Sequence, residues 1–419
     1  MAETPNYRAV RIGMILDAPY PEDGRVTKEA IALQAAGHEV FLLCVRRPGE
    51  PRRETVLGIR VVRLRRGLSL FAKTAWDSLA ALLWRHPVFA RSLSGFVRDH
   101  GLECLHVHDL PLAGTVARGA ARAGVPWVLD LHENFPAGLQ IWNVHKTRWI
   151  VRLKNALLMS YGRWLRYEGR MVARATAVIA VVEEMRRRLV EVHGVPAEKV
   201  AIVTNSEWRD FFERFETVEA VRAAYPGDFL VLYLGYYGPH RGVDTVIRAM
   251  PSVLRAVPRA RFVVVGRGTF RDNLERLALE LGVEDAVEFR GLVPYAEVGS
   301  WMRRADVNVV PHLRNEHTDH TVPHKLFQSM LSGRPTIVSS APPLARIAAE
   351  TGGALVFMAG DPESLAEAIT RAHANPGEMH DLTGRAVAAT RDGGYNWDTD
   401  QAHLTRLYSG LAGETGPRA

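Results

Sequence analysis

Short, continuous runs of apolar residues recur along the whole chain, separated by segments with helical patterns. In the first half the runs are VRIGMIL, EVFLLCV, IRVVRLR, CLHVHD, WVLDLH, AVIAVV and VAIVTN, and in the second they are FLVLYLG, RFVVVG, VEFRGLV, VNVVPH, PTIVSS and GALVFM. Continuous rather than alternating hydrophobicity is typical of strands covered on both faces, as in parallel sheets with crossover helices. The pattern predicts an α/β chain with two Rossmann-like, doubly wound domains.

The polar segment at residues 205–228, NSEWRDFFERFETVEAVRAAYPGD, separates the two halves. We place the boundary there, which gives a first domain of residues 1–207 and a second of 208–395. A C-terminal helix at about residues 396–419 is expected to cross back to the first domain. Doubly wound sheets bind ligands at the carboxyl ends of their strands, so we expect a ligand site in a cleft between the facing domains.

Composition narrows the classes of protein further. The chain is 47% hydrophobic and 24% charged, as in ordinary globular proteins, and its net charge of +7 suits a phosphate-bearing partner or simply a basic surface. Cys44 and Cys104 fall inside apolar runs, so buried free thiols are expected. We find no signal-peptide pattern or membrane-spanning run, which predicts a cytoplasmic enzyme. The excess of arginine over lysine indicates a GC-rich bacterial genome.

Residues 232–250, LYLGYYGPHRGVDTVIRAM, carry the strongest chemical signal at a strand end. Gly235, Gly238 and Gly242 bracket His240 and Arg241 just ahead of a helix. The planar fork of arginine makes two parallel charge-assisted hydrogen bonds to phosphate, so this loop predicts an anion site. A solvated capping loop is the alternative interpretation.

Two strand ends in the first half are further candidates. Gly24 and Arg25 open a helix after the strand that ends near Asp17, where backbone N–H groups could approach an anion, although a plain βα turn would look similar. In DLHENFP, His132 stands where a strand leaves the core and is expected to point into the ligand site; a histidine hydrogen-bonded to a neighbouring carbonyl is the alternative. Of the alternating His106 and His108, one is expected to be structural.

Residues 320–335, HTVPHKLFQSMLSGRP, predict a loop that enters a helix at Val322-Pro323. His324 and Lys325 then fall in its first turn, where cations are disfavoured unless an anion binds. Histidines are dense here, but Pro323 interrupts the helical spacing that a metal site on one helix face needs, so no metal is predicted. Gly266-x-Gly268 is weak support for a nicotinamide cofactor because a third glycine is missing.

Together these segments resemble the GT-B glycosyltransferases, in particular the retaining glycosyltransferase family 4. The resemblance runs from RIGMILDAPYPEDGRVTKEAIALQAAGHEV to GALVFMAGDPESLAEAI, and its sharpest parts are LGYYGPHRGVDTVIRAMPSVLRAVPRARFVVVGRG, VEFRGLVPYAEVGSWMRRADVNVVPH and HKLFQSMLSGRPTIVSS. It implies an N-terminal acceptor-binding domain, a C-terminal domain that binds a UDP- or GDP-linked sugar, and a metal-independent, cofactor-free transferase.

The resemblance also implies roles for individual residues. Arg241 stands where the family contacts the donor diphosphate, Tyr236 where it often has an arginine that His240 can replace, and His132 beside the transferred sugar. The catalytic set is then His132, Arg241 and Lys325. The donor-binding set is Gly24, Arg25, Gly235, Tyr236, His240, Gly266, Arg290, Val293, His320, Thr321, Val322, Pro323, His324 and Gln328, with residues 290–293 framing the nucleobase.

The family's E-x7-E motif falls on His320 and Gln328, so both glutamates are replaced. Either side chain can still bond a sugar or ribose hydroxyl, which leaves the choice of UDP or GDP and of the sugar open. The family chemistry needs no carboxylate pair: cations and helix N–H groups stabilise the departing diphosphate.

The acceptor is expected to meet the first domain, as a small molecule of a bacterial pathway or a growing glycan. Residues 136–172 mix Trp142, Trp149 and Trp164 with basic residues, which fits either peripheral contact with a membrane or helices packed on their own sheet. A GT-B sugar-nucleotide epimerase and a nucleotide-sugar-binding member with little transferase activity stay as alternatives. No recognition motif supports binding of nucleic acid. The oligomeric state is not predicted.

Overall fold

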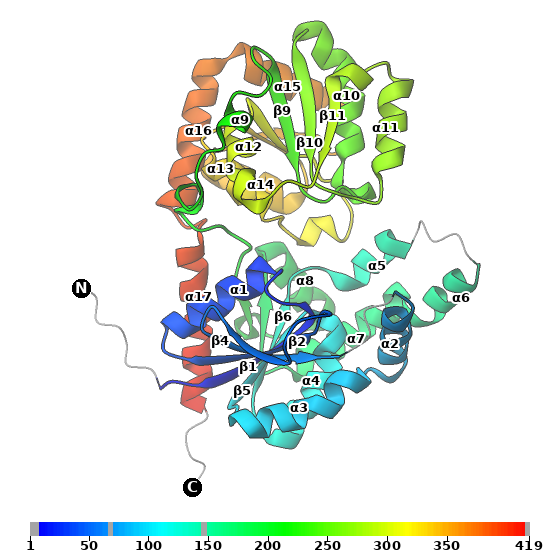
Figure 1. Cartoon of the computed structure of the whole chain (residues 1–419), viewed down its shortest axis with the longest axis vertical. Helices are drawn as coiled ribbons and strands as arrows, with labels where there is room; N and C mark the ends of the chain where they lie inside the picture. Colours follow the sequence, from blue (N-terminus) through cyan, green and yellow to red (C-terminus); the bar gives the residue numbers. More distant parts are fainter. Residues whose placement is uncertain (1–7, 66–69, 144–148, 415–419) are drawn as a thin grey trace. The chain divides into compact units, whose positions relative to one another are not determined.

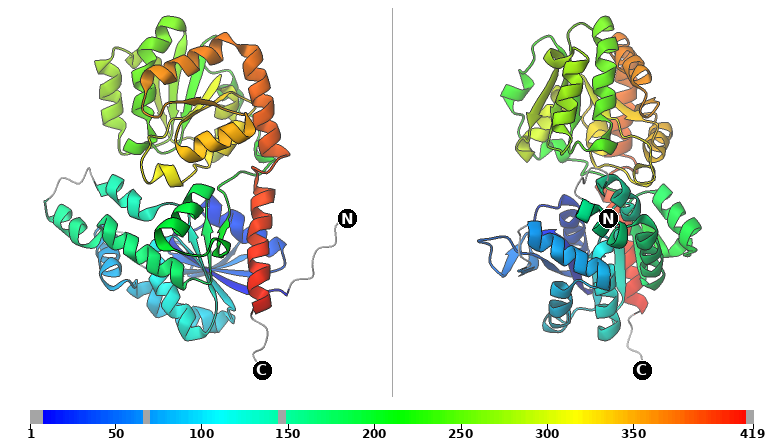
Figure 2. Two further views of the ribbon diagram at one scale, coloured as in Figure 1. Left: turned by 180° about the vertical axis from the view of Figure 1, so that it is seen from behind. Right: turned by 90° about the vertical axis from the view of Figure 1, so that its right-hand side faces the viewer.

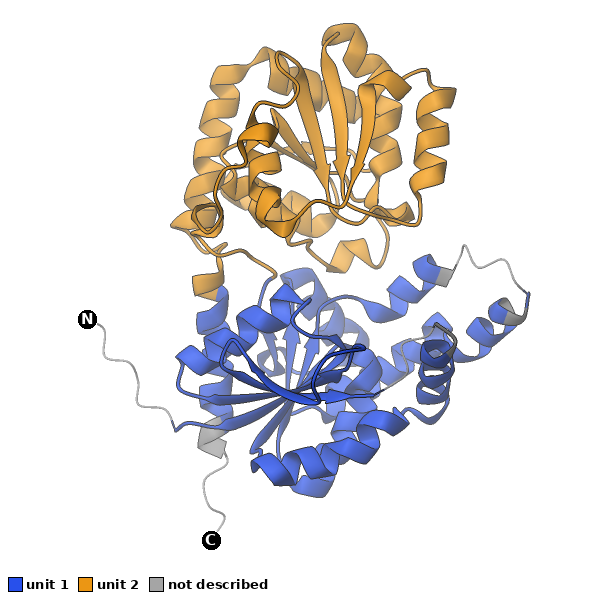
Figure 3. Cartoon of the chain, in the orientation of Figure 1, with its two compact units in different colours: residues 1–204, 400–419 blue, residues 205–399 orange. Residues whose placement is uncertain are grey.

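Two mostly parallel sheets organise the computed structural model, which describes residues 8–65, 70–143 and 149–414. The chain divides into two units (Figure 3): unit 1 is residues 1–204 with 400–419, and unit 2 is residues 205–399. In each unit helices cover both faces of the sheet, as the views in Figures 1 and 2 show. Each unit is therefore Rossmann-like, as the apolar runs predict.

Unit 1 has the strand order β3-β4-β2-β1-β5-β6-β7-β8. The strands that follow β1 in the chain are added on one side of it, and the strands from β5 onwards are added on the other side. The carboxyl ends of β1 and β5 therefore form the switch point where such folds bind ligands. The strands are β1 (Arg11–Pro19), β2 (Glu39–Val45), β3 (Arg53–Val56), β4 (Ile59–Leu64), β5 (Cys104–His108), β6 (Trp127–Leu131), β7 (Ala177–Ala180) and β8 (Val200–Ile202). The helices are α1 (Gly24–Ala35), α2 (Leu70–Leu83), α3 (Pro87–His100), α4 (Ala113–Ala123), α5 (Phe135–Asn143), α6 (Trp149–Leu158), α7 (Tyr161–Arg174) and α8 (Glu183–His193), joined by most of α17 (Trp397–Glu414).

Strand β3 is the one described strand that the hydrophobic pattern does not predict. It pairs antiparallel with β4 at the edge of the sheet, and three of its four residues are exposed. Leu57 and Gly58 link the two strands with φ of 52° and 80°, the left-handed conformation of a tight two-residue hairpin. An exposed edge strand needs no apolar run, so the expectation of purely parallel pairing is wrong at this edge.

Unit 2 has the strand order β11-β10-β9-β12-β13-β14, with its switch point between β9 and β12. The strands are β9 (Phe229–Leu234), β10 (Ala260–Val265), β11 (Val287–Gly291), β12 (Val307–Val310), β13 (Thr336–Ser339) and β14 (Leu355–Phe357). The helices are α9 (Glu219–Arg222), α10 (Val243–Ala256), α11 (Arg271–Glu280), α12 (Val298–Arg304), α13 (Lys325–Leu331), α14 (Pro342–Thr351), α15 (Pro362–Ala374) and α16 (Pro376–Arg391).

The burial of β9 explains why its sequence is apolar without alternation. Val231 and Tyr233 join the hydrophobic cluster on one face of the sheet, whereas Leu230 and Leu232 join a separate cluster on the other. Every apolar run predicted as a strand contains one. Cys44 and Cys104 are buried free thiols, as expected. Among the described residues, no helix is long and apolar enough to cross a membrane.

Candidate functional site

Three loops stack at the carboxyl ends of β9, β10 and β11 in unit 2. The Gly235 N–H donates to Val265 O, and the Gly266 N–H donates to Gly291 O, each at 2.8 Å. Gly266 has φ of 139°, and a Cβ atom there would lie 2.0 Å from Gly235 O. A side chain at Gly266 would therefore clash with backbone, and glycine lets the first two loops meet closely.

Arg241 and Lys325 lie beside this stack, near the switch point. Arg241 closes the short helix η4 (Pro239–Arg241), and its Nη1 donates to His312 Nε2 at 3.1 Å. The Lys325 ammonium lies 3.7 Å from the centre of the Tyr233 ring, and a Cβ atom on Gly235 would lie 3.5 Å from its Nζ. Residues far apart in the sequence thus bring two cations to the carboxyl end of β9.

The protonation of this cluster is held back by burial and positive charge. Burial and the Arg241 guanidinium lower the pKa of Lys325 well below its ordinary value. The same two causes lower the pKa of His312 well below its usual range and that of His240 to about 3. An anion bound beside these groups would relieve the repulsion, so the cluster is suited to a phosphate group.

The helix that carries Lys325 begins later than predicted. α13 starts at Lys325, so Val322 and Pro323 precede the helix instead of opening it. His324 Nε2 lies 2.7 Å from Glu207 Oε2, and the Gln328 amide nitrogen donates to the same oxygen at 2.9 Å. The carboxylate beside this turn therefore comes from Glu207, which is 3% exposed and is not among the residues predicted from the sequence.

The remaining candidates of unit 2 spread over neighbouring loops. The His320 Nδ1–H donates to Glu316 O at 2.8 Å. Arg290 is exposed and pairs with Glu288 at 2.9 Å, with its guanidinium 5.0 Å from the centre of the Trp301 ring. Tyr236 is exposed and its hydroxyl lies 3.0 Å from Thr269 Oγ1, Thr321 donates to His317 O at 3.0 Å, Val322 is buried, and Pro323 and Val293 are half-buried.

In unit 1, His132 belongs to a buried charged network at the carboxyl ends of β5 and β6. One oxygen of Asp130, Oδ2, is in direct contact with His132 Nε2, lies 2.9 Å from His108 Nδ1 and lies 3.5 Å from His106 Nε2. Glu29 Oε1 approaches His132 Nε2 to 3.8 Å. His132 is only 4% exposed, and its ring lies among carboxylates inside unit 1. The expectation was a ring that points into an open ligand site.

The charges of this network set the protonation of His132. Although burial and Arg25 act against protonation, Asp130 and Asp109 together raise the pKa of His132 well above its ordinary value. Asp109 Oδ1 lies 3.6 Å from His132 Nδ1, and Asp109 has φ of 66°, a strained conformation for a residue other than glycine. The two carboxylates therefore favour the protonated form of the His132 ring over the neutral form.

Gly24 and Arg25 open α1 on the same side of unit 1. Asp23 caps the helix by accepting from Arg25 N at 3.0 Å, and its carboxylate also binds the Arg25 guanidinium at 2.8 Å. The charge of Arg25 is thus partly neutralised by its neighbour. Potential metal-ligand atoms lie within 4.8 Å of one another in a group formed by Glu29, His108, Asp130 and His132. The contacts of these residues with one another account for this spacing without a metal ion.

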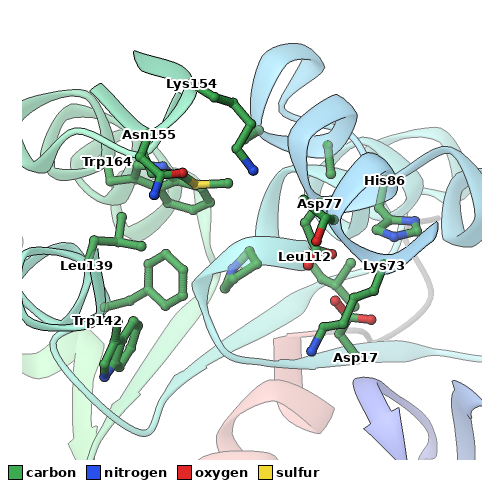
Figure 4. A pocket seen from close by; sticks show the side chains of 16 residues that line it. Asp17, Lys73, Asp77, His86, Leu112, Leu139, Trp142, Lys154, Asn155 and Trp164 are labelled. Atoms are coloured by element: carbon green, nitrogen blue, oxygen red, sulfur yellow. The ribbon is translucent and has the colours of Figure 1, made fainter. Parts of the chain in front are cut away.

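Unit 1 also contains a cavity of about 430 Å³ that begins at Asp17 near the end of β1. Figure 4 shows Leu139, Trp142 and Trp164 on one side and Asp17, Asp77 and His86 on the other. The cavity is amphiphilic: an aromatic wall faces two carboxylates and an imidazole. It is lined by Asp17, Lys73, Thr74, Asp77, Ala80, Ala81, His86, Pro111, Leu112, Phe135, Leu139, Trp142, Lys154, Asn155, Met159 and Trp164.

Two family profiles match the chain in succession. Residues 25–206 match the glycosyl transferase 4-like domain, and residues 215–388 match glycosyl transferases group 1. The chain belongs to the family 4-like glycosyltransferases. The glycosyltransferase is similar in fold to the crystal structure of HepE from Anabaena in complex with UDP-glucose, with a TM-score of 0.72 and 15% identity over 96% of this chain and 100% of that one. Its fold is GT-B.

Curated relatives carry named activities. The D-inositol 3-phosphate glycosyltransferase of Thermomonospora curvata is 30% identical over 261 residues, which are 58% of this chain and 59% of that relative, less than two thirds of its length. The phosphatidyl-myo-inositol mannosyltransferase of Mycolicibacterium smegmatis is 25% identical over 416 residues, 96% of this chain and 95% of that relative.

The glycosyltransferase has site residues that strand-end reasoning did not reveal. Glu29 comes from the middle of α1, and Glu207 lies in the polar segment between the two sheets. Asp109 follows His108 in HVHD, and Asp130 lies two residues before His132 in DLHE, so a carboxylate beside a strand-end histidine is the sequence signal for both. For Glu207 the sequence offered no such signal, because its partners are more than 100 residues away.

Proposed function

We propose that the protein transfers a sugar from a UDP- or GDP-linked donor to an acceptor, with retention of anomeric configuration and without a metal ion. The acceptor is a small molecule or a growing glycan. The observation that carries the donor half is the cationic cluster of Arg241 and Lys325 beside the glycine loops of unit 2. The HepE complex with UDP-glucose, which shares the fold, supports a nucleotide sugar as the donor class.

Charge development in the reaction explains the need for this cluster. Breaking the anomeric C–O bond leaves positive charge on the sugar and an extra negative charge on the diphosphate. Arg241 can hold two phosphate oxygens with its planar fork. The Lys325 amine becomes fully protonated as the anion binds and adds a positive point charge. Both charges act on the leaving group, which is the role a metal ion has in other transferases.

Retention is proposed on the family resemblance. In this scheme the acceptor hydroxyl enters on the face that the diphosphate leaves, and a phosphate oxygen takes its proton. The raised pKa of His132 supports this scheme, because a ring that keeps its proton does not remove another. The ring instead contributes a fixed donor and positive charge in unit 1.

The cavity of unit 1 is the proposed acceptor site. Its aromatic wall can cover an apolar or ring face of an acceptor, while Asp17, Asp77 and His86 can orient hydroxyl groups. The names of the two curated relatives point to an inositol-containing acceptor as one candidate. Other polyhydroxylated acceptors with an apolar portion fit the same chemistry.

A lipid-linked acceptor gains support from helix α6. Trp149, Leu153 and Leu157 recur every four residues, so they share one face of the helix, and they are 71%, 54% and 65% exposed. We propose peripheral contact of this face with a membrane. Residues 144–148 of the predicted basic segment lie outside the described residues. Co-sedimentation with phosphatidylglycerol vesicles should fall for Leu157→Ser and not for the exposed control Leu279→Ser of unit 2; equal binding by both would remove this proposal.

The test of the main proposal is a thermal-shift screen with UDP, GDP, ADP and their sugars, since bound ligand raises the apparent stability. A shift with one nucleoside diphosphate names the donor class, and no shift with any would overturn the proposed site. Incubation with that nucleotide sugar alone then separates the alternatives. An epimerase would produce a new nucleotide sugar without acceptor, whereas a transferase would leave the donor nearly unchanged.

A further inference from the structure

The C-terminal helix reaches the charged network of unit 1 through one hydrogen bond. Tyr408 of α17 is fully buried, and its hydroxyl lies 2.7 Å from Nδ1 of His106 on β5. The Tyr408 and His106 rings are also nearly parallel, with an angle of 11° between their planes. Residues 302 positions apart in the chain therefore meet in the core of unit 1.

The surroundings decide which atom carries each proton. The other ring nitrogen of His106, Nε2, faces two carboxylates, with Glu29 Oε2 and Asp130 Oδ2 both at 3.5 Å. A proton on Nε2 is favoured there, and burial keeps the ring neutral by lowering the pKa of His106. Nδ1 is then an acceptor, and the Tyr408 O–H donates to it; burial raises the pKa of Tyr408, so this proton is retained.

The Asp130 carboxylate links His106 to His132, because both rings lie against its Oδ2 atom. Its Oδ2 lies 2.9 Å from His108 Nδ1 and 3.5 Å from His106 Nε2, and it is in direct contact with His132 Nε2, so three imidazoles share this one oxygen. If His106 turned its bare nitrogen towards Asp130, a lone pair would face the carboxylate and repel it. The tautomer of His106 therefore affects where the Asp130 carboxylate rests, and with it the ring of His132.

We propose that Tyr408 is a positioning residue for His132, acting through His106 and Asp130, so that the C-terminal helix is part of the machinery of the transfer site. This inference rests on the proposed function for the role of His132 in sugar transfer. The groups that face the network include Asp23 before α1, Arg25 and Glu29 of α1, Cys104, His106 and His108 of β5, Asp109 after it, Asp130 of β6 and Tyr408 of α17.

The first test reads the network without any substrate. Tyr408→Phe removes the hydroxyl and keeps the ring, and Tyr167→Phe is a matched control, because Tyr167 is also buried and its hydroxyl accepts the Gly114 N–H at 2.6 Å. In the full chain labelled with 15N-histidine, Tyr408→Phe should move the ring-nitrogen NMR signals of both His106 and His132, and Tyr167→Phe should move neither. Unchanged His132 signals in Tyr408→Phe overturn the inference.

The second test reads the reaction. With the nucleotide sugar found by thermal shift, Tyr408→Phe should lower kcat about tenfold with little change in the donor KM, and Tyr167→Phe should lose similar thermal stability without that loss of kcat. Asp130→Asn should lower kcat further, and adding Tyr408→Phe to it should have little additional effect, because both act through one path. Fully additive losses would overturn the relay. If the NMR signals move but the unmodified chain turns over no nucleotide sugar, the relay stands and the proposed function fails.

Discussion

Glu207 Oε2 accepts a hydrogen bond from the Gln328 amide nitrogen at 2.9 Å inside unit 2, and both side chains are buried. By the resemblance to family 4, Gln328 is expected to stand where the motif has its second glutamate. The carboxylate beside Gln328 belongs to Glu207, a residue from the start of unit 2. The imidazole of His324 turns to the same oxygen, so the anion that meets His324 is Glu207.

The substitution Gln328→Glu should therefore lower the free energy of unfolding. Gln328→Glu places two carboxylates within hydrogen-bond distance in a buried site, which raises the pKa of one of them. A carboxyl group whose pKa is raised by folding lowers the free energy of unfolding at pH values above its pKa in the unfolded chain. The loss should therefore grow as the pH rises from about 4 to about 7. Urea unfolding across this range measures it.

The charge-swapped double variant is the control for this prediction. Combining Gln328→Glu with Glu207→Gln restores one carboxylate and one amide, so it should recover most of the lost stability at neutral pH. A double variant less stable than Gln328→Glu alone would contradict the pairing of these two side chains.

Arg241→Ala and Lys325→Ala should each weaken binding of the preferred nucleoside diphosphate by roughly 1–3 kcal/mol, the cost of losing a charged hydrogen bond. Titration calorimetry with UDP and GDP measures the effect. Arg255→Ala is a suitable control, because this arginine bonds the nearby Ser252 on the exposed face of α10. Unchanged affinity in both site variants would move the donor site elsewhere.

Binding of the nucleotide should also take up protons. Burial and Arg241 hold the pKa values of Lys325, His240 and His312 low in the free protein, and a bound diphosphate supplies the opposite charge that raises them. Because the nucleotide binds best when these groups are protonated, its affinity should decrease as the pH rises. Calorimetry in two buffers with different ionisation enthalpies counts the protons, and release of protons on binding would refute this view of the cluster.

Gly266→Ala should destabilise unit 2 strongly. Its φ of 139° is strained for alanine, and the new Cβ atom would lie 2.0 Å from the Gly235 carbonyl oxygen. Gly282→Ala separates the two causes, because Gly282 also has a positive φ, 65°, but a Cβ atom there has no neighbour within 4 Å. We expect a loss of about 1 kcal/mol for Gly282→Ala and several times more for Gly266→Ala, measured by urea unfolding. Equal losses would show that the loops can separate.

The sequence alone determined the described strands other than β3, the two Rossmann-like units and the loops that carry Arg241 and His132. These follow from local patterns. A strand buried on both faces must be apolar along its length, and a position where two loops meet closely requires glycine. The edge strand β3 escaped because exposed pairing leaves no such pattern. Tertiary structure alone decided that Glu207 meets Gln328, that Tyr408 meets His106, and that His132 lies between Asp109 and Asp130. Those contacts depend on how distant elements pack, and packing replaces water around a charge with whichever partner the fold brings near.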